Sequence, residues 1–354
     1  MNTERSFIRN DMRTPFSRRA FVAICICIAA LILGIVIGSV NIPPLNVLRV
    51  IGYHVFGIEL SEHVPPAHVA IIWNLRLPRT LLAFIAGAAL SVSGAVMQSV
   101  LRNPLASSYT LGVSSGASFG AALVIFLGVT LPFMAMLTLP ILGFLFGLGT
   151  ILTVMAIARQ LDTRMENHTI ILTGMVFALF INAITTLMFA FFRESMQRMI
   201  FWQMGSFSLR DWHTVYILAP IALVGILFIS RFKWELDVMT FGEEQAQAIG
   251  VNIRRVKLTL LITAAALTGS TIAFVGVIGF VDLVAPHVVR KIFGASHKHV
   301  IPMSAVVGGA FMVLADLAAR TVTSPVELPV GAVTAIIGAP FFAYIYFNRR
   351  KVFS

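Results

Sequence analysis

Hydrophobic residues in this chain gather in long runs that contain almost no charged residues. A helix needs about 20 residues to cross the roughly 30 Å hydrocarbon core of a bilayer. Runs near that length fall at residues 20–40, 77–100, 107–128, 134–158, 166–192, 213–231, 300–320 and 331–348. The pattern therefore predicts an all-α protein that crosses a membrane many times.

A further apolar stretch, Val256–Val289, is too long to be one span. A single helix of about 34 residues would rise roughly 50 Å, well beyond the hydrocarbon core. Basic residues flank the stretch on both sides, so the positive-inside rule places both of its ends in the cytoplasm. Two short spans that turn near Gly276 and Gly279 satisfy the length and the orientation together. The prediction is then ten spans, with both chain termini cytoplasmic.

Composition and charge agree with this organisation. Hydrophobic residues make up 58% of the chain and charged residues 12%, whereas soluble domains carry about 25% charged residues. The net charge of +11 could indicate nucleic-acid binding, but most basic residues lie in short segments between apolar runs on the predicted inner side. The sequence therefore favours membrane lipids as surroundings, with no nucleic-acid partner.

The predicted domain organisation is simple. Residues 1–19 form a basic cytoplasmic N-terminus, 20–348 a single ten-helix domain, and 349–354 a cytoplasmic C-terminus. The first apolar run is too long for a signal peptide, so we interpret it as an uncleaved span. These features are typical of a multi-pass protein of the bacterial inner (plasma) membrane.

Candidate chemistry is scarce. The sequence contains no GxxxxGK[ST] nucleotide loop, no paired carboxylates at a useful spacing, and no Ser-His-Asp or Cys-His cluster. We therefore predict no catalytic residue, no metal site and no cofactor. Small residues crowd the second and third spans, as in helices that pack closely on other helices in a membrane.

Several ordered motifs lie between about residues 70 and 345 of the chain. They are Arg76-Leu77-Pro78-Arg79, Gly87-Ala88-Ala89-Leu90, Arg102-Asn103-Pro104-Leu105-Ala106, Gly112-Val113-Ser114-Ser115-Gly116-Ala117, Ala285-Pro286-His287, Glu327-Leu328-Pro329-Val330-Gly331 and Gly338-Ala339-Pro340. In this order they resemble the iron-siderophore and vitamin B12 (FecCD-type) permease family of ATP-binding-cassette (ABC) importers. Asp282 departs from the family pattern, which often has a small residue such as glycine there, and is expected either near the outer turn or in a polar cavity.

The resemblance implies a type II ABC importer permease fold with ten helices and no enzymatic activity of its own. It also implies a second permease subunit, identical or related, two copies of a cytoplasmic ATP-binding subunit, and a periplasmic or lipid-anchored substrate-binding protein. Ferric siderophore is the leading cargo, with haem and cobalamin as alternatives. The cargo would cross by alternating access.

The resemblance also suggests roles for individual residues. Arg76, Arg79 and Arg320 lie at the outer ends of spans, and we expect them to dock acidic residues of the binding protein, since arginine binds carboxylates well. The alternatives are interfacial snorkelling or an internal pair, because Asp316 and Arg320 are four residues apart on one helix.

The segment 232–255 is the longest predicted cytoplasmic connection. Within it, Phe241–Gly250 is predicted to form a short helix that Gly250 ends. An amphipathic helix on the membrane surface is one interpretation; the resemblance implies a coupling helix that contacts the ATP-binding subunit. The expected contact residues are Glu243, Glu244, Gln247, Ala248 and Gly250.

Polar residues on the fifth span give candidates for the translocation pathway. The resemblance implies that this helix lines much of the pathway, so Thr173, Asn182 and Thr186 are expected to line it; polar residues within spans usually face protein or water. Ser and Thr can instead bond to their own helix. His297 and His299 are expected to be solvated in an inner loop.

Two rival functions remain at this stage. An ion-coupled secondary transporter would need intramembrane charges, and its candidates, Asp282 and Asp316, are both expected near the outer side. A membrane enzyme is disfavoured by the missing catalytic groups. We therefore expect a permease subunit whose energy comes from a partner.

Overall fold

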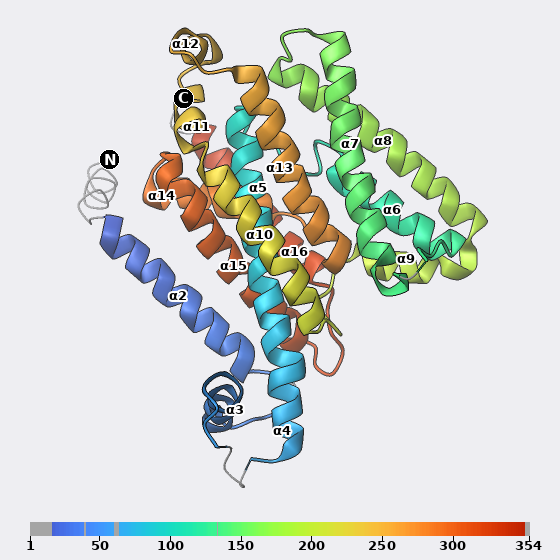
Figure 1. The fold of residues 1–354 in the computed structure, drawn as a ribbon, viewed down its shortest axis with the longest axis vertical. Coiled ribbons are helices and arrows are strands. Elements are labelled where there is room, and N and C mark those ends of the chain that lie inside the picture. The colour runs from blue at the N-terminus through green and yellow to red at the C-terminus, as the bar shows by residue number, and fades with distance from the viewer. Residues whose placement is uncertain (1–15, 39, 60–63, 133, 351–354) are drawn as a thin grey trace.

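The structure is a computed structural model that describes residues 16–38, 40–59, 64–132 and 134–350. Within these residues the chain forms helices joined by loops and turns, and no β-strand occurs. The all-α prediction is therefore confirmed for the described part of the chain. In Figure 1, α5, α10, α13 and α15 run along the middle of the molecule, α6 to α9 form a group on one side, and α2 lies on the other.

The long helices follow the apolar runs closely. The helices are α2 Phe16–Val36, α3 Pro44–Phe56, α4 Pro66–Ala70, α5 Leu77–Val100, α6 Val113–Leu127, α7 Thr138–Leu161, α8 Asn167–Phe191, α9 Met196–Gln203, α10 Trp212–Ser230, α11 Lys233–Met239, α12 Glu243–Ala248, α13 Ile253–Val275, α14 Val281–Phe293, α15 His297–Thr321 and α16 Val330–Arg350. A π-helical turn, Ile71–Arg76, joins α4 to α5. The sequence did not predict α3 or α11.

Among the described helices, 7 are long and apolar enough to cross a membrane. Val113–Leu127 and Val330–Ala343 are shorter apolar segments. The remaining helix of the expected set, α14, has 13 residues and would rise only about 20 Å. Helix length and composition therefore establish a multi-span helical protein, and the count of ten spans stays a prediction.

The long apolar stretch does fold back on itself. Helix α13 ends at Val275, and Gly276 follows with φ of 79°. A Cβ atom at Gly276 would lie 2.2 Å from the carbonyl oxygen of Trp202, so this position requires glycine for both its backbone angle and its close packing. Helix α14 begins at Val281, which places the turn where the sequence predicted it.

Contacts between the helix ends show which segments share one end of the molecule. Arg19, near the start of α2, donates to the carbonyl of Ile292, near the end of α14, at 2.7 Å. His297, at the start of α15, bonds to Asp237 of α11. The segments expected to be cytoplasmic therefore lie together, and α13 leads away from them while α14 returns.

Close backbone approach holds the centre of the bundle together. A Cβ atom at Gly87 of α5 would lie 2.3 Å from the carbonyl oxygen of Gly308 on α15. At Gly94 it would lie 1.9 Å from the carbonyl oxygen of Asp282 on α14. Small residues permit such contact between helices in a membrane, and the predicted tight packing of the second span is confirmed.

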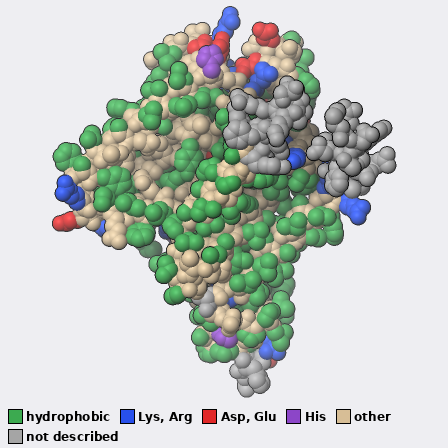
Figure 2. All heavy atoms as spheres, turned by 180° about the vertical axis from the view of Figure 1, so that it is seen from behind, with side chains coloured by type: hydrophobic (Ala, Val, Ile, Leu, Met, Phe, Trp, Pro, Cys, Tyr) green, Lys and Arg blue, Asp and Glu red, His purple; other side chains and the backbone are tan. Residues whose placement is uncertain are grey.

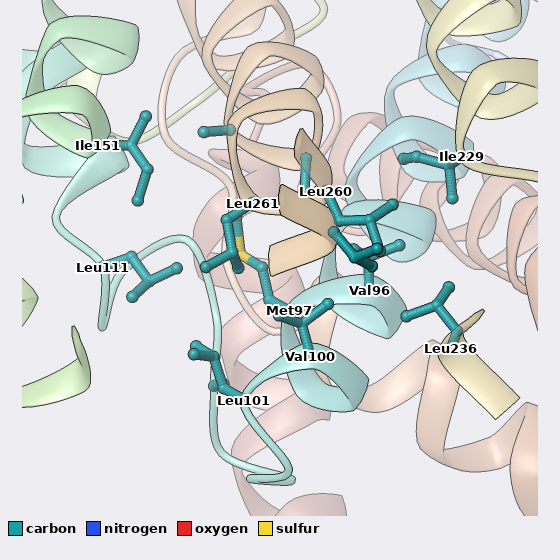
Figure 3. Packing of buried hydrophobic residues seen from close by; sticks show 14 of the residues in the cluster. Val96, Met97, Val100, Leu101, Leu111, Ile151, Ile229, Leu236, Leu260 and Leu261 are labelled. Carbon is teal, nitrogen blue, oxygen red and sulfur yellow. The ribbon is translucent and has the colours of Figure 1, made fainter. Parts of the chain in front are cut away.

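A large hydrophobic cluster joins α5 to α13 near the end of the molecule that carries α11 and α12. Figure 3 shows its members, with Val96 and Met97 of α5 against Leu260 and Leu261 of α13. Leu236 of α11 belongs to the same cluster. The segment 232–255 is thus packed onto the bundle rather than projecting loosely from it.

The outer surface is apolar around the middle of the molecule. On the face in Figure 2, hydrophobic side chains cover the middle, and most charged side chains lie at the upper end or at the edges. Helix α2 contributes many exposed large side chains, among them Phe21 at 67% and Ile26 at 55% exposed. This distribution fits a chain that uses lipid as its solvent.

Candidate functional site

Helix α12 forms the centre of the predicted coupling segment. It ends as predicted, because Gly250 has φ of 94° and its N–H donates to the carbonyl of Gln247 at 2.9 Å. The N–H of Val251 donates to Ala246 at 3.0 Å, completing a glycine-type helix end. Ala246 is fully buried, so one face of α12 packs inward and the other is free to contact a partner.

Four of the five expected contact residues lie on the exposed side of this segment. They are Glu244, Gln247, Ala248 and Gly250. Phe241 and Ile249 are also strongly exposed, at 79% and 58%. The sequence reasoning missed these two apolar side chains, although large exposed apolar groups beside polar ones are typical of protein contact surfaces.

The fifth expected contact residue, Glu243, points back to the bundle. Its carboxylate lies 2.8 Å from Nζ of Lys257, whose side chain is fully buried at the start of α13. Lys257 also donates to the carbonyl oxygen of Met165 at 3.0 Å. This lysine therefore joins α12, α13 and the loop between α7 and α8, and we call the three residues the lysine tether.

The loop that carries Met165 has its own fixed shape. The Asp162 carboxylate accepts from the N–H groups of Glu166 at 2.7 Å and Arg164 at 2.9 Å. These two backbone hydrogen bonds lower the pKa of Asp162 below its ordinary value. The loop thus presents the Met165 carbonyl to Lys257 from a stable turn.

A second polar contact joins α11 to α15. Asp237 accepts from the N–H of His297 at 2.7 Å and lies 2.6 Å from Nδ1 of its ring. Ser296 adds a bond at 3.1 Å. Burial raises the pKa of Asp237, but the hydrogen bonds from His297 and Ser296 lower it more, so it stays below its ordinary value.

His297 continues this contact into the bundle. Its Nε2 lies 2.7 Å from Oγ of Ser99 on α5, and the Ser99 oxygen accepts from Arg290 of α14 at 3.1 Å. A neutral imidazole satisfies all these bonds, with Nδ1–H donating to Asp237 and Nε2 accepting from the Ser99 hydroxyl. We call Asp237, His297, Ser99 and Arg290 the histidine tether.

The solvated position expected for His297 is therefore wrong, since the residue is 2% exposed. It is buried because α11 covers the start of α15 and supplies the carboxylate that satisfies it. The tether also brings Ser, His and Asp together, which the linear spacing did not reveal. Ser99 is 9% exposed and its oxygen is bonded to Arg290, so the arrangement supports packing rather than nucleophilic chemistry.

Asp282 lies in the same part of the bundle. Its Oδ2 accepts from the Ser108 hydroxyl at 3.1 Å and from the Ser108 N–H at 3.3 Å. Its carbonyl accepts from Gln98 at 3.0 Å, and Gln98 in turn accepts from Arg290 at 2.5 Å. The expected position near the outer side is wrong, because the short α14 begins beside the last turns of α5.

The three arginines expected at the outer side all have partners within the chain. Arg76 is 5% exposed and donates to carbonyls at the end of α2, those of Ile35 at 3.2 Å, Val36 at 2.6 Å and Val40. Arg320, also 5% exposed, donates to the carbonyl of Gly34 at 2.5 Å.

Two carboxylates complete the cluster that these arginines form, which we call the outer cluster after its expected side. Asp316 pairs with Arg79 at 2.8 Å and with Arg320 at 3.6 Å. Glu327 pairs with Arg79 at 2.8 Å. Burial raises the pKa of Glu327, but Arg79 lowers it more, so it stays below its ordinary value. The internal-pair alternative is confirmed for Asp316 and Arg320, and docking by these arginines stays a prediction.

The three pathway candidates do not share one face of α8. Thr173 is buried, whereas Asn182 and Thr186 are exposed. Asn182 follows Thr173 by nine residues, which is about two and a half helical turns. The two side chains therefore point to opposite sides of α8. Thr186 donates to the carbonyl of Asn182 at 2.9 Å, as hydroxyls in membrane helices often do.

Comparison with known proteins decides the family. The FecCD transport family matches residues 26–348. The chain belongs to the FecCD transport family. This family assignment confirms the resemblance drawn from the sequence motifs and covers nearly all of the described bundle.

Similar proteins extend over the same region. An uncharacterized ABC transporter permease protein of Bacillus subtilis, YvrB, is 40% identical over 98% of both chains. The cobalamin import permease BtuC of Halobacterium salinarum is 37% identical over 83% of this chain and 78% of its own length. The Fe(3+)-citrate import permease YfmE of Bacillus subtilis is 34% identical over 96% and 98%.

A solved structure gives the same answer for the fold. An inward-facing metal-chelate-type ABC transporter superposes with a TM-score of 0.79 at 28% identity, over 93% of this chain and 98% of that one. As a FecCD permease, the chain is a non-catalytic membrane subunit of an ABC importer, which works with ATPase and substrate-binding partners. The predicted absence of enzymatic activity is therefore confirmed.

Proposed function

We propose that this chain carries an iron chelate, with ferric siderophore as the leading cargo, from an external binding protein into the cytoplasm by alternating access. The names of several relatives support a chelate, since they include Fe(3+)-citrate, hemin and cobalamin, and one relative is a molybdate permease. Cobalamin and haem are the alternative cargoes. Two permease subunits and two ATP-binding subunits would form the complete importer in the inner membrane.

The observation that carries the proposal is the exposed face of α12 together with its buried attachment. Glu244, Gln247, Ala248 and Gly250 face away from the bundle, while Ala246 and Glu243 fix the helix to it. A surface that must transmit force needs both an open side for the partner and a rigid connection to the moving helices. We infer that this face, enlarged by Phe241 and Ile249, contacts the ATP-binding subunit.

The two tethers give the coupling a physical route. The lysine tether connects α12 to α13 and to the loop before α8, and the histidine tether connects α11 to α15, α5 and α14. Movement of 232–255 on ATP binding would therefore shift several helices together. This proposal requires both termini and α12 to be cytoplasmic and the described bundle to cross the membrane ten times.

The outer cluster is the proposed docking site for the binding protein. Its location near the ends of α2 and α15 opposite to α12 supports this. Because Arg79 already pairs with Asp316 and Glu327, a carboxylate of the binding protein would reach Arg79 by displacing the more exposed Glu327. Arg76 and Arg320 would act by holding the cluster in place.

The pathway proposal rests on the exposed face of α8. Asn182 and Thr186 lie on it, one turn apart, and a second permease subunit packed nearby would enclose this face and form a polar lining. Thr173 lies on the other face, against the bundle. We therefore propose Asn182 and Thr186 as lining residues and Thr173 as a neighbour of α6.

An ion-coupled secondary transporter is not favoured. The two carboxylates that could carry an ion are held by the protein, Asp282 by Ser108 and Asp316 by Arg79. The ion pair with Arg79 removes the open charge of Asp316 that ion coupling would need, and Asp282 is then a single buried carboxylate bonded to a neutral hydroxyl.

Transport by the assembled importer in proteoliposomes tests the function. Labelled ferric siderophores, haem and cobalamin would be offered with the binding protein outside and ATP at the ATPase side. We expect uptake of a ferric siderophore that requires ATP hydrolysis. Selective uptake of haem or cobalamin would change the cargo, and uptake driven by an ion gradient without ATP would overturn the proposal.

A further inference from the structure

An apolar groove lies on the outside of the bundle between α2, α14 and α15. Its volume is about 620 Å³, within the range of about 300–1,000 Å³ typical of ligand sites. Its lining includes Ala23 and Ile26 of α2, Ile292 of α14 and Leu314 of α15, together with Arg18 and Arg19. The lining is therefore apolar except for two neighbouring arginines from the first turn of α2.

The groove has a defined direction. Arg18 and Arg19 lie at the end shared with α11 and α12, and Ile26 lies about 12 Å further along α2, at 1.5 Å per residue. Half of the roughly 30 Å hydrocarbon core is about 15 Å. In the proposed topology, on which this inference rests, the groove would span most of the cytoplasmic leaflet and its charged end would lie at the level of the lipid headgroups.

The charged end is held in place by contacts between the three helices. Arg19 donates to the carbonyl of Ile292 at 2.7 Å. Phe16 stacks on His299 with ring centroids 3.9 Å apart and meets Phe293 edge-on at 6.0 Å. Arg18 is exposed beside these contacts, so its guanidinium can receive an anion without breaking the packing.

We propose that this groove binds an anionic phospholipid of the cytoplasmic leaflet, with an acyl chain along α2 and the phosphate at Arg18 and Arg19. Arginine binds phosphate through a planar set of donors. Basic pockets between membrane helices on the cytoplasmic side are suited to anionic headgroups. The apolar wall supplies affinity through buried acyl methylenes, and the arginines supply the preference for negative charge.

A second copy of the chain is the rival occupant. A twofold contact centred on this groove would place the same arginines from both copies beside one another. Repulsion between these like charges disfavours that contact. The charge therefore favours a lipid over a second subunit.

Lipid retention by the full-length chain tests the proposal. The protein, purified in neutral detergent, would be incubated with phosphatidylglycerol or phosphatidylcholine of identical acyl chains, and bound lipid would be counted by native mass spectrometry. We expect about five-fold or greater preference for phosphatidylglycerol, falling to near parity in Arg18→Gln. Arg164→Gln, which removes an exposed arginine from the loop after α7, is the matched control and should keep the preference.

Further measurements separate the contribution of the acyl chain from that of the phosphate. Ala23→Phe fills the groove and should reduce retention of both lipids, while the thermal midpoint checks that the variant is folded. Inorganic phosphate should not displace phosphatidylglycerol, since the acyl chain contributes to binding. Equal retention of the two lipids by the native chain, or equal loss in Arg18→Gln and Arg164→Gln, would overturn the proposal. A change of oligomeric state in Ala23→Phe would instead assign the groove to a subunit contact.

Discussion

Replacing Lys257 with methionine probes the connection between α12 and the bundle. Methionine keeps the length of the side chain but removes the charge, leaving the Glu243 carboxylate and the Met165 carbonyl without the lysine that pairs with both. Removing one partner of a buried ion pair costs about 3–5 kcal/mol. Glu243 is 28% exposed, so water can partly rehydrate it, and we expect a loss of about 2–3 kcal/mol.

Such a loss lowers the thermal midpoint by about 4–12 °C, at about 2–4 °C per kcal/mol for domains of 150–250 residues. It should also lower the amount of cargo transported per ATP hydrolysed, because α12 would move without carrying α13. Thermal unfolding in detergent and paired transport and ATPase measurements on the assembled importer give the two readouts. The double variant Lys257→Met with Glu243→Gln should recover at least half of the lost stability, since no charge is then left unpaired.

Lys233→Met is the matched control, because Lys233 is exposed at the start of α11. An exposed lysine contributes little, and the expected change is within about 0.5 kcal/mol. If Lys257→Met kept both the native thermal midpoint and the native ratio of transport to ATP hydrolysis, the reasoning about the lysine tether would be refuted.

Three further predictions follow from particular contacts. Asp237→Asn should lower the thermal midpoint by a few degrees at neutral pH, and the difference from the native chain should shrink below about pH 4. A carboxylate with a lowered pKa stabilises above its ordinary pKa and loses this effect as the pH falls through the lowered value. A constant difference down to pH 3 would contradict this. Gly94→Ala should abolish correct assembly, because its Cβ would lie 1.9 Å from the carbonyl of Asp282. At Gly149 nothing lies within 4 Å of the added Cβ, so Gly149→Ala should be neutral or slightly stabilising. Equal yields of folded protein from the two variants would contradict the close contact of α5 with α14. Glu244→Arg should leave folding unchanged and reduce ATP-dependent transport at least several-fold; native transport would exclude this residue from the ATPase contact.

Much of the bundle could be predicted because its determinants are local. Apolar runs of the right length predicted the long helices, and the excess length of Val256–Val289 predicted a turn at Gly276. The backbone angle at this turn requires glycine, so the glycine in the sequence indicates the turn directly. The end of α12 at Gly250 was predictable for the same reason.

The tethers could not be predicted, because they join residues far apart in the chain. Lys257 looked like one of several basic residues at the edge of an apolar run, yet it is fully buried. His297 looked solvated until α11, an unpredicted helix, placed Asp237 against it. A lysine or histidine at the start of an apolar run indicates a buried tether only when a carboxylate can be placed close to it.

The depth of Asp282 could not be predicted for a related reason. A turn at the outer surface predicts that α14 also starts there. With only 13 residues, α14 instead begins beside Gly94 and Gln98 of α5. Helix length was therefore the information that could have corrected this expectation.

The orientation of α12 tests the central claim most directly. A single cysteine at Gln247, in a chain whose native Cys25 and Cys27 are replaced by alanine, would be labelled with a membrane-impermeant maleimide in vesicles of each orientation. We predict labelling only when the cytoplasmic face is accessible, with protection when the ATP-binding subunit is bound. Labelling from the periplasmic face would contradict the topology and the proposed ATPase contact together.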